Sequence, residues 1–250
     1  GDYPVGMKVY RVEHFEDGAT MEEIPEFNNL LLYAGCSIRL SSIKGIRMIT
    51  GISSSLKNAL TGGGAAGYTL EEYVLKNFDP GVYDFFHGEV GMTEEDMKHE
   101  QAYWHEYVQH HVPQVYDGMR DILWDYVHAG GTICVVSHSL SPNILRDYRE
   151  NKLPEPKLVY GWEVPKEQRK PHPDALFDIM EKLHFAPGEM LVLDDLKPGY
   201  DMAKAANVRF AAAGWSNDIP EIEAFMRQNC DLYFKTVETF GDYLLHGKEA

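Results

Sequence analysis

Residues 189–208, with the sequence EMLVLDDLKPGYDMAKAANV, constrain the fold of this chain more than any other segment. Residues 190–193 are a short apolar run typical of a buried strand in a parallel sheet, and a helix-forming segment follows. Asp194 and Asp195 lie at the carboxyl end of this strand, where α/β sheets bind ligands. Adjacent carboxylates repel each other unless a positive group lies beside them, which favours a hard cation such as Mg²⁺. The alternative is a solvated turn that caps the next helix.

Strand and helix patterns alternate through the second half of the chain. The apolar runs predict strands at residues 132–136, 157–160, 190–193, 208–213 and 231–234. Amphipathic segments between and after them predict helices at residues 118–129, 143–150, 174–184, 200–206, 220–228 and 237–245. An earlier apolar run, residues 30–33, is the first candidate for a central strand. This alternation predicts an α/β fold, a doubly wound parallel sheet of the Rossmann-like kind.

Residues 51–115 differ from the rest because they are helix-prone and interrupted by glycine-rich breaks. Thr93 is the predicted N-cap of a helix that continues past residue 98. We therefore predict a helical cap domain at residues 51–115, inserted into a core domain formed by residues 1–50 and 116–250. The histidines of the cap lack the spacing of a zinc site and are interpreted as surface residues; they are His99, His105, His110 and His111.

The charge balance limits the partners. With 39 acidic and 23 basic residues the formal net charge is -16, which argues against nucleic acid or an anionic membrane as a partner. No apolar run is long enough to cross a bilayer, and the first residues lack the pattern of a signal peptide. Three cysteines without ligand spacing, Cys36, Cys134 and Cys230, fit reduced thiols. We expect a cytoplasmic protein.

Two further polar residues are predicted to lie at the same sheet edge as the acid pair. Ser137 follows the predicted strand 132–136, and its hydroxyl and the next backbone N–H groups could hold an anionic oxygen. Lys170 lies just before the helix at 174–184 and is followed by Pro171 and Pro173, which stiffen the segment. Its ammonium could neutralise the charge of a phosphoryl oxygen. Each residue alone fits a simpler interpretation, a helix cap or turn for Ser137 and a solvent-facing side chain for Lys170. Their occurrence in order at successive strand ends favours a shared site.

These segments resemble the haloacid dehalogenase superfamily of hydrolases. The matching segments are TICVVSHS with Ser137, RKPHPDALFDIMEKL with Lys170, and LVLDDLKPGYDMAKAANV with Asp194 and Asp195. The resemblance implies a Rossmann-like core with a cap domain and phosphatase chemistry on a small phosphorylated molecule. In that family an aspartate attacks the phosphoryl group to form an aspartyl-phosphate, and Mg²⁺ bridges the acids and the phosphate. It also implies that Ser137 and Lys170 bind phosphate and that the two acids bind the metal.

The first motif of that family is degenerate here. The family has Asp-x-Asp-Gly-Thr after an apolar strand, and the best match, LLLYAGCSI, places Tyr33 at the nucleophile position and Gly35 at the acid/base position. Cys36 is interpreted as a small buried residue rather than as a replacement nucleophile. The fourth motif differs too, because the acid expected four residues after Asp195 is Gly199, and Asp201 is predicted to cap the helix.

Two functions therefore remain open. The first is a Mg²⁺-dependent hydrolase of the phosphatase type that acts on a small phosphorylated metabolite. The second is a catalytically silent binding or regulatory protein that keeps the fold and a remnant anion or metal pocket, which accounts directly for Tyr33 and Gly35.

Overall fold

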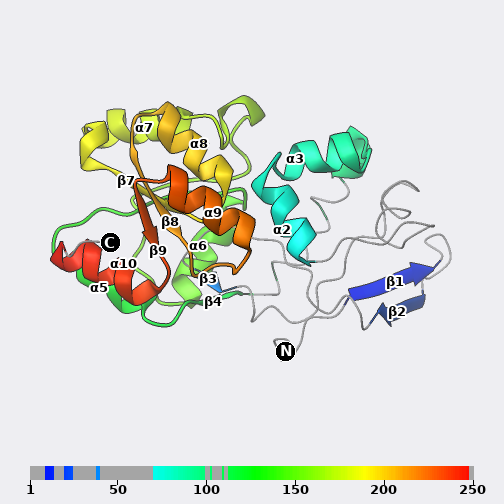
Figure 1. Cartoon of the computed structure of the whole chain (residues 1–250), viewed down its shortest axis with the longest axis horizontal. Helices are drawn as coiled ribbons and strands as arrows, with labels where there is room; N and C mark the ends of the chain where they lie inside the picture. Colours follow the sequence, from blue (N-terminus) through cyan, green and yellow to red (C-terminus); the bar gives the residue numbers. More distant parts are fainter. Residues whose placement is uncertain are drawn as a thin grey trace. The chain divides into compact units, whose positions relative to one another are not determined.

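The computed structural model describes residues 9–13, 20–24, 38–39, 70–98, 102, 109 and 112–247 (Figure 1). The chain divides into two compact units. The first comprises residues Gly1–Tyr33 and Leu40–Pro113, and the second comprises Ala34–Arg39 and Gln114–Ala250. The core and cap domains expected from the sequence, with boundaries at 50/51 and 115/116, stay a prediction.

The first unit contains a β-hairpin and a group of short helices. Strands β1 (Val9–Glu13) and β2 (Thr20–Ile24) pair in antiparallel fashion. The helical segments are α2 (Leu70–Phe78), α3 (Val82–Asp84) and the π-helical turn η3 (Phe85–Glu89). Phe85 and Phe86 are buried, with ring centroids 5.3 Å apart. They belong to a buried apolar core of this unit that also includes Tyr73, Val90 and Met92.

The N-cap predicted at Thr93 is confirmed. A helix begins at residue 94, and the Asp96 backbone N–H donates to Thr93 Oγ1 at 3.2 Å. The Thr93 backbone N–H donates in turn to Asp96 Oδ2 at 2.9 Å. This reciprocal pair of bonds satisfies two backbone donors at the start of the helix.

Parallel strands build the second unit. Strands β5 (Cys134–Val136) and β6 (Leu158–Tyr160) form one parallel pair. Strands β7 (Leu191–Asp194), β8 (Arg209–Ala213) and β9 (Leu232–Phe234) form a second parallel sheet in the order β7-β8-β9. A short antiparallel pair, β3 (Ile38–Arg39) with β4 (Gln114–Val115), completes the described strands. The α/β fold with parallel strands is confirmed.

Helices follow each of the five parallel strands. They are α6 (Ser141–Glu150), α7 (Asp174–Leu183), α8 (Lys197–Ala205), α9 (Pro220–Asn229) and α10 (Val237–His246), and α5 (Met119–His128) precedes β5. Two short 3₁₀ turns, η4 (Lys166–Gln168) and η5 (Pro187–Glu189), lie in the connections. Proline occupies the first turn of α6, α8 and α9, where its missing N–H costs nothing. No helix in the described ranges is long and apolar enough to cross a membrane.

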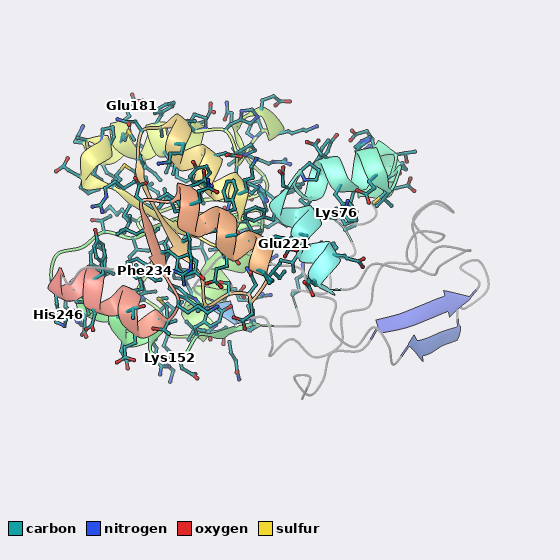
Figure 2. The ribbon with its side chains drawn as sticks, in the orientation of Figure 1. Lys76, Lys152, Glu181, Glu221, Phe234 and His246 are labelled. Atoms are coloured by element: carbon teal, nitrogen blue, oxygen red, sulfur yellow. The ribbon has the colours of Figure 1, made fainter. Side chains whose placement is uncertain are left out.

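The two parallel sheets share the same two apolar layers. Alternate strand residues, among them Val135 of β5 and Leu193 of β7, contact a cluster that also contains residues of α5, α6 and α10. The residues between them, such as Val136 and Val192, contact a second cluster formed with α7 and α8. Figure 1 shows α7 and α8 on one side of strands β7–β9 and α5 and α10 on the other. Phe234, labelled in Figure 2, is 1% exposed and packs against Phe240.

The strands differ in burial, and this corrects one expectation. The sequence predicts that residues 190–193 are fully buried, but residues 190–193 are only half-buried, as are those of β5. Residues Phe210 to Ala213 of β8 are at most 1% exposed. The reason is the position in the sheet: β8 pairs on both sides, whereas β7 pairs on one side within the described residues.

Candidate functional site

Asp194, the last residue of β7, is a buried carboxylate with several partners. Its Oδ2 accepts a hydrogen bond from Lys170 Nζ at 2.6 Å. Its Oδ1 accepts from the backbone N–H groups of Asp195 at 2.8 Å and Leu196 at 3.3 Å. Burial alone would raise the pKa of Asp194, but the Lys170 ammonium and these donors outweigh it and hold that pKa below its ordinary value. Asp194 is therefore ionised at neutral pH.

Asp195 is also buried, but it differs from Asp194 in its hydrogen bonding and in its pKa. Its Oδ1 has no hydrogen-bond partner among the described residues. Burial and the negative charge of Asp194 raise the pKa of Asp195 well above its usual value. A buried acceptor without a partner is costly, so this oxygen needs either a proton or a cation.

Ser137 lies directly after β5 and is buried. Its backbone N–H donates to the Tyr160 carbonyl at 2.9 Å, which ties it to the end of β6. Its Oγ accepts from the Ser139 backbone N–H at 3.1 Å, so the hydroxyl keeps its own proton to donate. Ser137 thus lies at the carboxyl end of β5, and its part in an anion site stays a prediction.

The loops after β5 and β6 are fastened to each other. The Trp162 backbone N–H donates to the Ser139 carbonyl at 2.8 Å, and the Ser141 N–H donates to Glu163 Oε2 at 3.2 Å. Gly161 allows this approach, because a Cβ there would lie 2.5 Å from the Ser141 backbone nitrogen. The loop that carries Ser137 is therefore held rigidly against the β6 loop.

Lys170 belongs to the segment between β6 and α7, and its neighbours are anchored. Arg169 Nε donates to the Val164 carbonyl at 2.6 Å, and its guanidinium lies 4.1 Å from the centre of the Trp162 ring. The Lys170 side chain is 9% exposed and that of Asp194 7%, so the ion pair between them is almost entirely shielded from water. Removing either partner would leave a buried charge.

His138 also belongs to this group, although the sequence analysis did not single it out. Its Nε2 lies 3.2 Å from the Lys170 carbonyl oxygen, and its ring meets Trp162 edge-on with centroids 5.7 Å apart. Burial, together with the positive charge of Lys170, lowers the pKa of His138 to about 4. The only sequence signal was its place directly after Ser137.

The structure brings most of the predicted site residues together within the second unit. Lys170 contacts Asp194, Asp195 is next in sequence, and Ser137 is joined to this group through His138. The first-motif positions, Tyr33 and Gly35, lie outside the described residues. Cys36 and the cap histidines His99, His105, His110 and His111 also lie outside them.

Asp201 was expected to cap a helix, and this is wrong. The helix α8 begins at Lys197, so Asp201 lies inside it and pairs with Lys197 at 3.2 Å. Pro198 lies in the first turn of α8, where proline is tolerated. Gly199 packs on Asp194, since a Cβ at Gly199 would lie 2.3 Å from Asp194 Oδ2.

The residues present fit a magnesium ion in part. Within the described ranges no group of three or more acidic, histidine or cysteine side chains could hold a metal. However, Mg²⁺ is often held by one or two carboxylates, with water and substrate phosphate as the other ligands. The unpartnered Oδ1 of buried Asp195 is an oxygen of the required kind.

Comparison with known proteins identifies the family. The model of the haloacid dehalogenase-like hydrolases matches residues 49–213, which is more than half of the chain and includes Ser137, Lys170, Asp194 and Asp195. The chain belongs to the haloacid dehalogenase-like hydrolases. No protein of curated function matches it.

Solved structures share the fold of this hydrolase. A protein from Bacteroides fragilis designated a haloacid dehalogenase-like hydrolase is 20% identical, with a TM-score of 0.58 and coverage of 76% of this chain and 91% of that chain. A protein from Lactobacillus delbrueckii subsp. bulgaricus designated a phosphoglycolate phosphatase is 16% identical, with a TM-score of 0.57 and coverage of 77% and 90%. CbbY from Rhodobacter sphaeroides, solved with phosphate, is 15% identical, with a TM-score of 0.51 and coverage of 76% and 87%.

Proposed function

We propose that this hydrolase is of the phosphatase type and binds the phosphate of a small phosphorylated metabolite together with Mg²⁺. The observation that carries the proposal is the unpartnered, buried Asp195 Oδ1, next to the shielded Lys170–Asp194 pair. A positive group and an oxygen that needs a cation are what a phosphate–magnesium pair requires. The phosphate bound in CbbY and the designation of the Lactobacillus protein as a phosphatase support the same ligand class.

Each residue has a separate task in this proposal. The Ser137 hydroxyl donates a hydrogen bond to a phosphoryl oxygen, because its acceptor side already receives the Ser139 N–H. Lys170 neutralises charge on the phosphoryl group while it remains close to Asp194. Asp195, with Asp194 nearby, holds the metal. Bound Mg²⁺ would neutralise the charge that develops on the phosphoryl oxygens. Residues 51–115 serve as a cap that selects the leaving group.

The first motif decides whether binding leads to hydrolysis. The family nucleophile is an aspartate, and we infer that Tyr33 and Gly35 occupy the nucleophile and acid/base positions here. A phenol and a hydrogen atom supply neither the attacking carboxylate nor its metal-ligating oxygen. Gly199, which packs on Asp194, also has no side-chain oxygen to offer as a ligand. These residues favour a second candidate function, a silent protein that binds phosphorylated ligands without turnover.

A phosphatase assay separates the two candidates. The protein is incubated with an aryl phosphate and a panel of small phosphorylated metabolites, with and without Mg²⁺. Turnover that requires Mg²⁺ and disappears in Lys170→Ala and in Asp195→Ala establishes the hydrolase. Phosphate binding without turnover establishes the silent protein, and Tyr33→Asp combined with Gly35→Asp then tests whether the remaining site supports chemistry. Absence of both binding and turnover would refute the proposal.

A further inference from the structure

His138 is held in one protonation form by its surroundings. A carbonyl oxygen can only accept, so the 3.2 Å contact between His138 Nε2 and the Lys170 carbonyl requires the proton on Nε2. The lowered pKa of about 4 keeps the ring neutral at physiological pH, so Nδ1 carries no proton. The edge-on contact with Trp162 fixes the plane of the ring. His138 is therefore an oriented donor aimed at one backbone atom.

The carbonyl that it contacts belongs to the lysine of the proposed phosphate site. Lys170 is followed by Pro171, which has no backbone N–H, so this part of the loop has one fewer donor with which to fix itself. Arg169 is anchored on the preceding side by Val164 and Trp162. The bond from His138 fixes the Lys170 backbone itself, and through it the starting point of the side chain that reaches Asp194 at 2.6 Å.

We propose that His138 is a positioning residue: its Nε2–H holds the Lys170 backbone so that the ammonium is aimed at Asp194 and at a bound phosphate. This inference rests on the proposed phosphate site but concerns a residue to which neither the family match nor the sequence assigned a role. His138 couples the loop after β5, which carries Ser137, to the loop that carries Lys170 across 32 residues of sequence. This hydrogen bond directly links the loop that carries the hydroxyl to the backbone of the residue that carries the ammonium.

Two substitutions separate the hydrogen bond from the ring. His138→Gln places an amide N–H at about the reach of Nε2 and removes the aromatic contact with Trp162. His138→Phe keeps an aromatic ring for Trp162 and removes the donor. If His138 acts only as packing, Phe is the milder change. If it acts as a donor, Gln is the milder change.

The first readout is the acylation rate of Lys170, measured by mass spectrometry on the whole 250-residue chain without ligand. The buried, paired amine reacts slowly in the wild type, and we expect about a tenfold increase in His138→Phe and less than about a threefold increase in His138→Gln, consistent with the loss of one hydrogen bond. Lys197, paired with Asp201 on α8, is the internal reference, and its rate should not change. Equal rates at Lys170 in the wild type and the Phe variant would overturn the proposal, as would equal increases in both variants.

The second readout is the dissociation constant of inorganic phosphate in the presence of Mg²⁺, measured by calorimetry. We expect about tenfold weaker binding in His138→Phe and a change within about threefold in His138→Gln. If the wild type binds no phosphate, the proposed function fails, while the acylation rates still test the positioning role. If the wild type binds phosphate and the Phe variant binds it equally well, the positioning role fails alone.

Discussion

The two parallel sheets of the second unit contribute different kinds of side chain to the candidate site. The β5–β6 sheet and its loops supply a hydroxyl, an imidazole and an ammonium, namely Ser137, His138 and Lys170. The β7–β8–β9 sheet supplies the two carboxylates, Asp194 and Asp195. Among the described residues, the ion pair between Lys170 and Asp194 joins these two sets.

The two sides also differ in how completely their polar groups are satisfied. On the β5–β6 side, the Ser137 N–H and Oγ and the His138 Nε2 have protein partners. On the β7 side, Asp194 is fully engaged, but Asp195 keeps one buried oxygen without a partner. The difference is that the polar groups of the first side are satisfied within the protein, whereas the second side keeps a buried acceptor, the one to which we assign the proposed cation.

The largest expected effect follows from breaking the link between the two sides. Lys170→Met leaves Asp194 buried and unpaired, and we expect the free energy of unfolding to fall by about 3–5 kcal/mol. Lys182→Met is the matched control, because Lys182 forms an exposed pair with Asp178 and its loss should cost less than about 1 kcal/mol. Urea denaturation measures both. Equal losses in the two variants would show that the Lys170–Asp194 pair is not specially shielded.

The neutral His138 on the β5–β6 side predicts a pH dependence. Its folded pKa of about 4 lies below the ordinary 6.5, so the unfolded chain binds the extra proton first as the pH falls. Stability is lost as pH falls from 6.5 through 4, and the loss approaches about 3 kcal/mol below that range. The groups whose charges act on this ring are Lys170, Arg169 and Asp194.

The measurement is the difference in unfolding free energy between the wild type and His138→Gln across this pH range. Because most other titrating groups are common to both proteins, they cancel in the difference. A difference that stays constant from about pH 7 to 4 would contradict a lowered pKa at His138.

The rigidity of the β5–β6 side is tested at Gly161. Gly161→Ala forces a Cβ to 2.5 Å from the Ser141 backbone nitrogen and 2.7 Å from the Ser139 carbonyl oxygen, so the two loops must separate. We expect a loss of about 1–3 kcal/mol by thermal or urea unfolding. Gly188→Ala is the control, because nothing lies within 4 Å of a Cβ at that position. If both variants unfold alike, the loops are not tightly fastened.

The smallest expected effect concerns the unsatisfied acid on the β7 side. The folded pKa of Asp195 is raised, so ionising it costs stability as the pH rises above the unfolded value, and Asp195→Asn removes this cost. Without metal or phosphate we expect the variant to be more stable at about pH 7 by about 1 kcal/mol. The gain should vanish in acid, where both states of the wild type are protonated. Wild-type stabilisation by added Mg²⁺ should be absent in the variant, and a variant that Mg²⁺ still stabilises would remove Asp195 from the metal site.

Much of this fold was predictable from local sequence. Strands β5 to β9 and the helices between them follow from apolar and amphipathic patterns of residues that are neighbours in sequence. The Thr93 cap is equally local. The start of α8 was missed because Pro198 and Gly199 look like helix breakers, although proline fits the first turn. The half-burial of β7 was missed because it depends on which strands pair beside it.

The candidate site was also predictable only in part. Ser137, Lys170 and Asp194 follow from their places at strand ends and before a helix, and the structure brings Lys170 to Asp194. The unequal states of Asp194 and Asp195 could not be predicted, because they depend on which carboxylate Lys170 reaches. The contact of His138 with Lys170 joins loops that are distant in sequence and carries no local signal.

A crystal structure of the protein grown with Mg²⁺ and tungstate, a phosphate analogue, tests the central claim most directly. We expect a metal ion at about 2.0–2.1 Å from Asp195 Oδ1 and an oxyanion within hydrogen-bonding distance of Ser137 Oγ and Lys170 Nζ. A structure in which Asp195 binds no metal and the oxyanion binds away from Ser137 and Lys170 would contradict it.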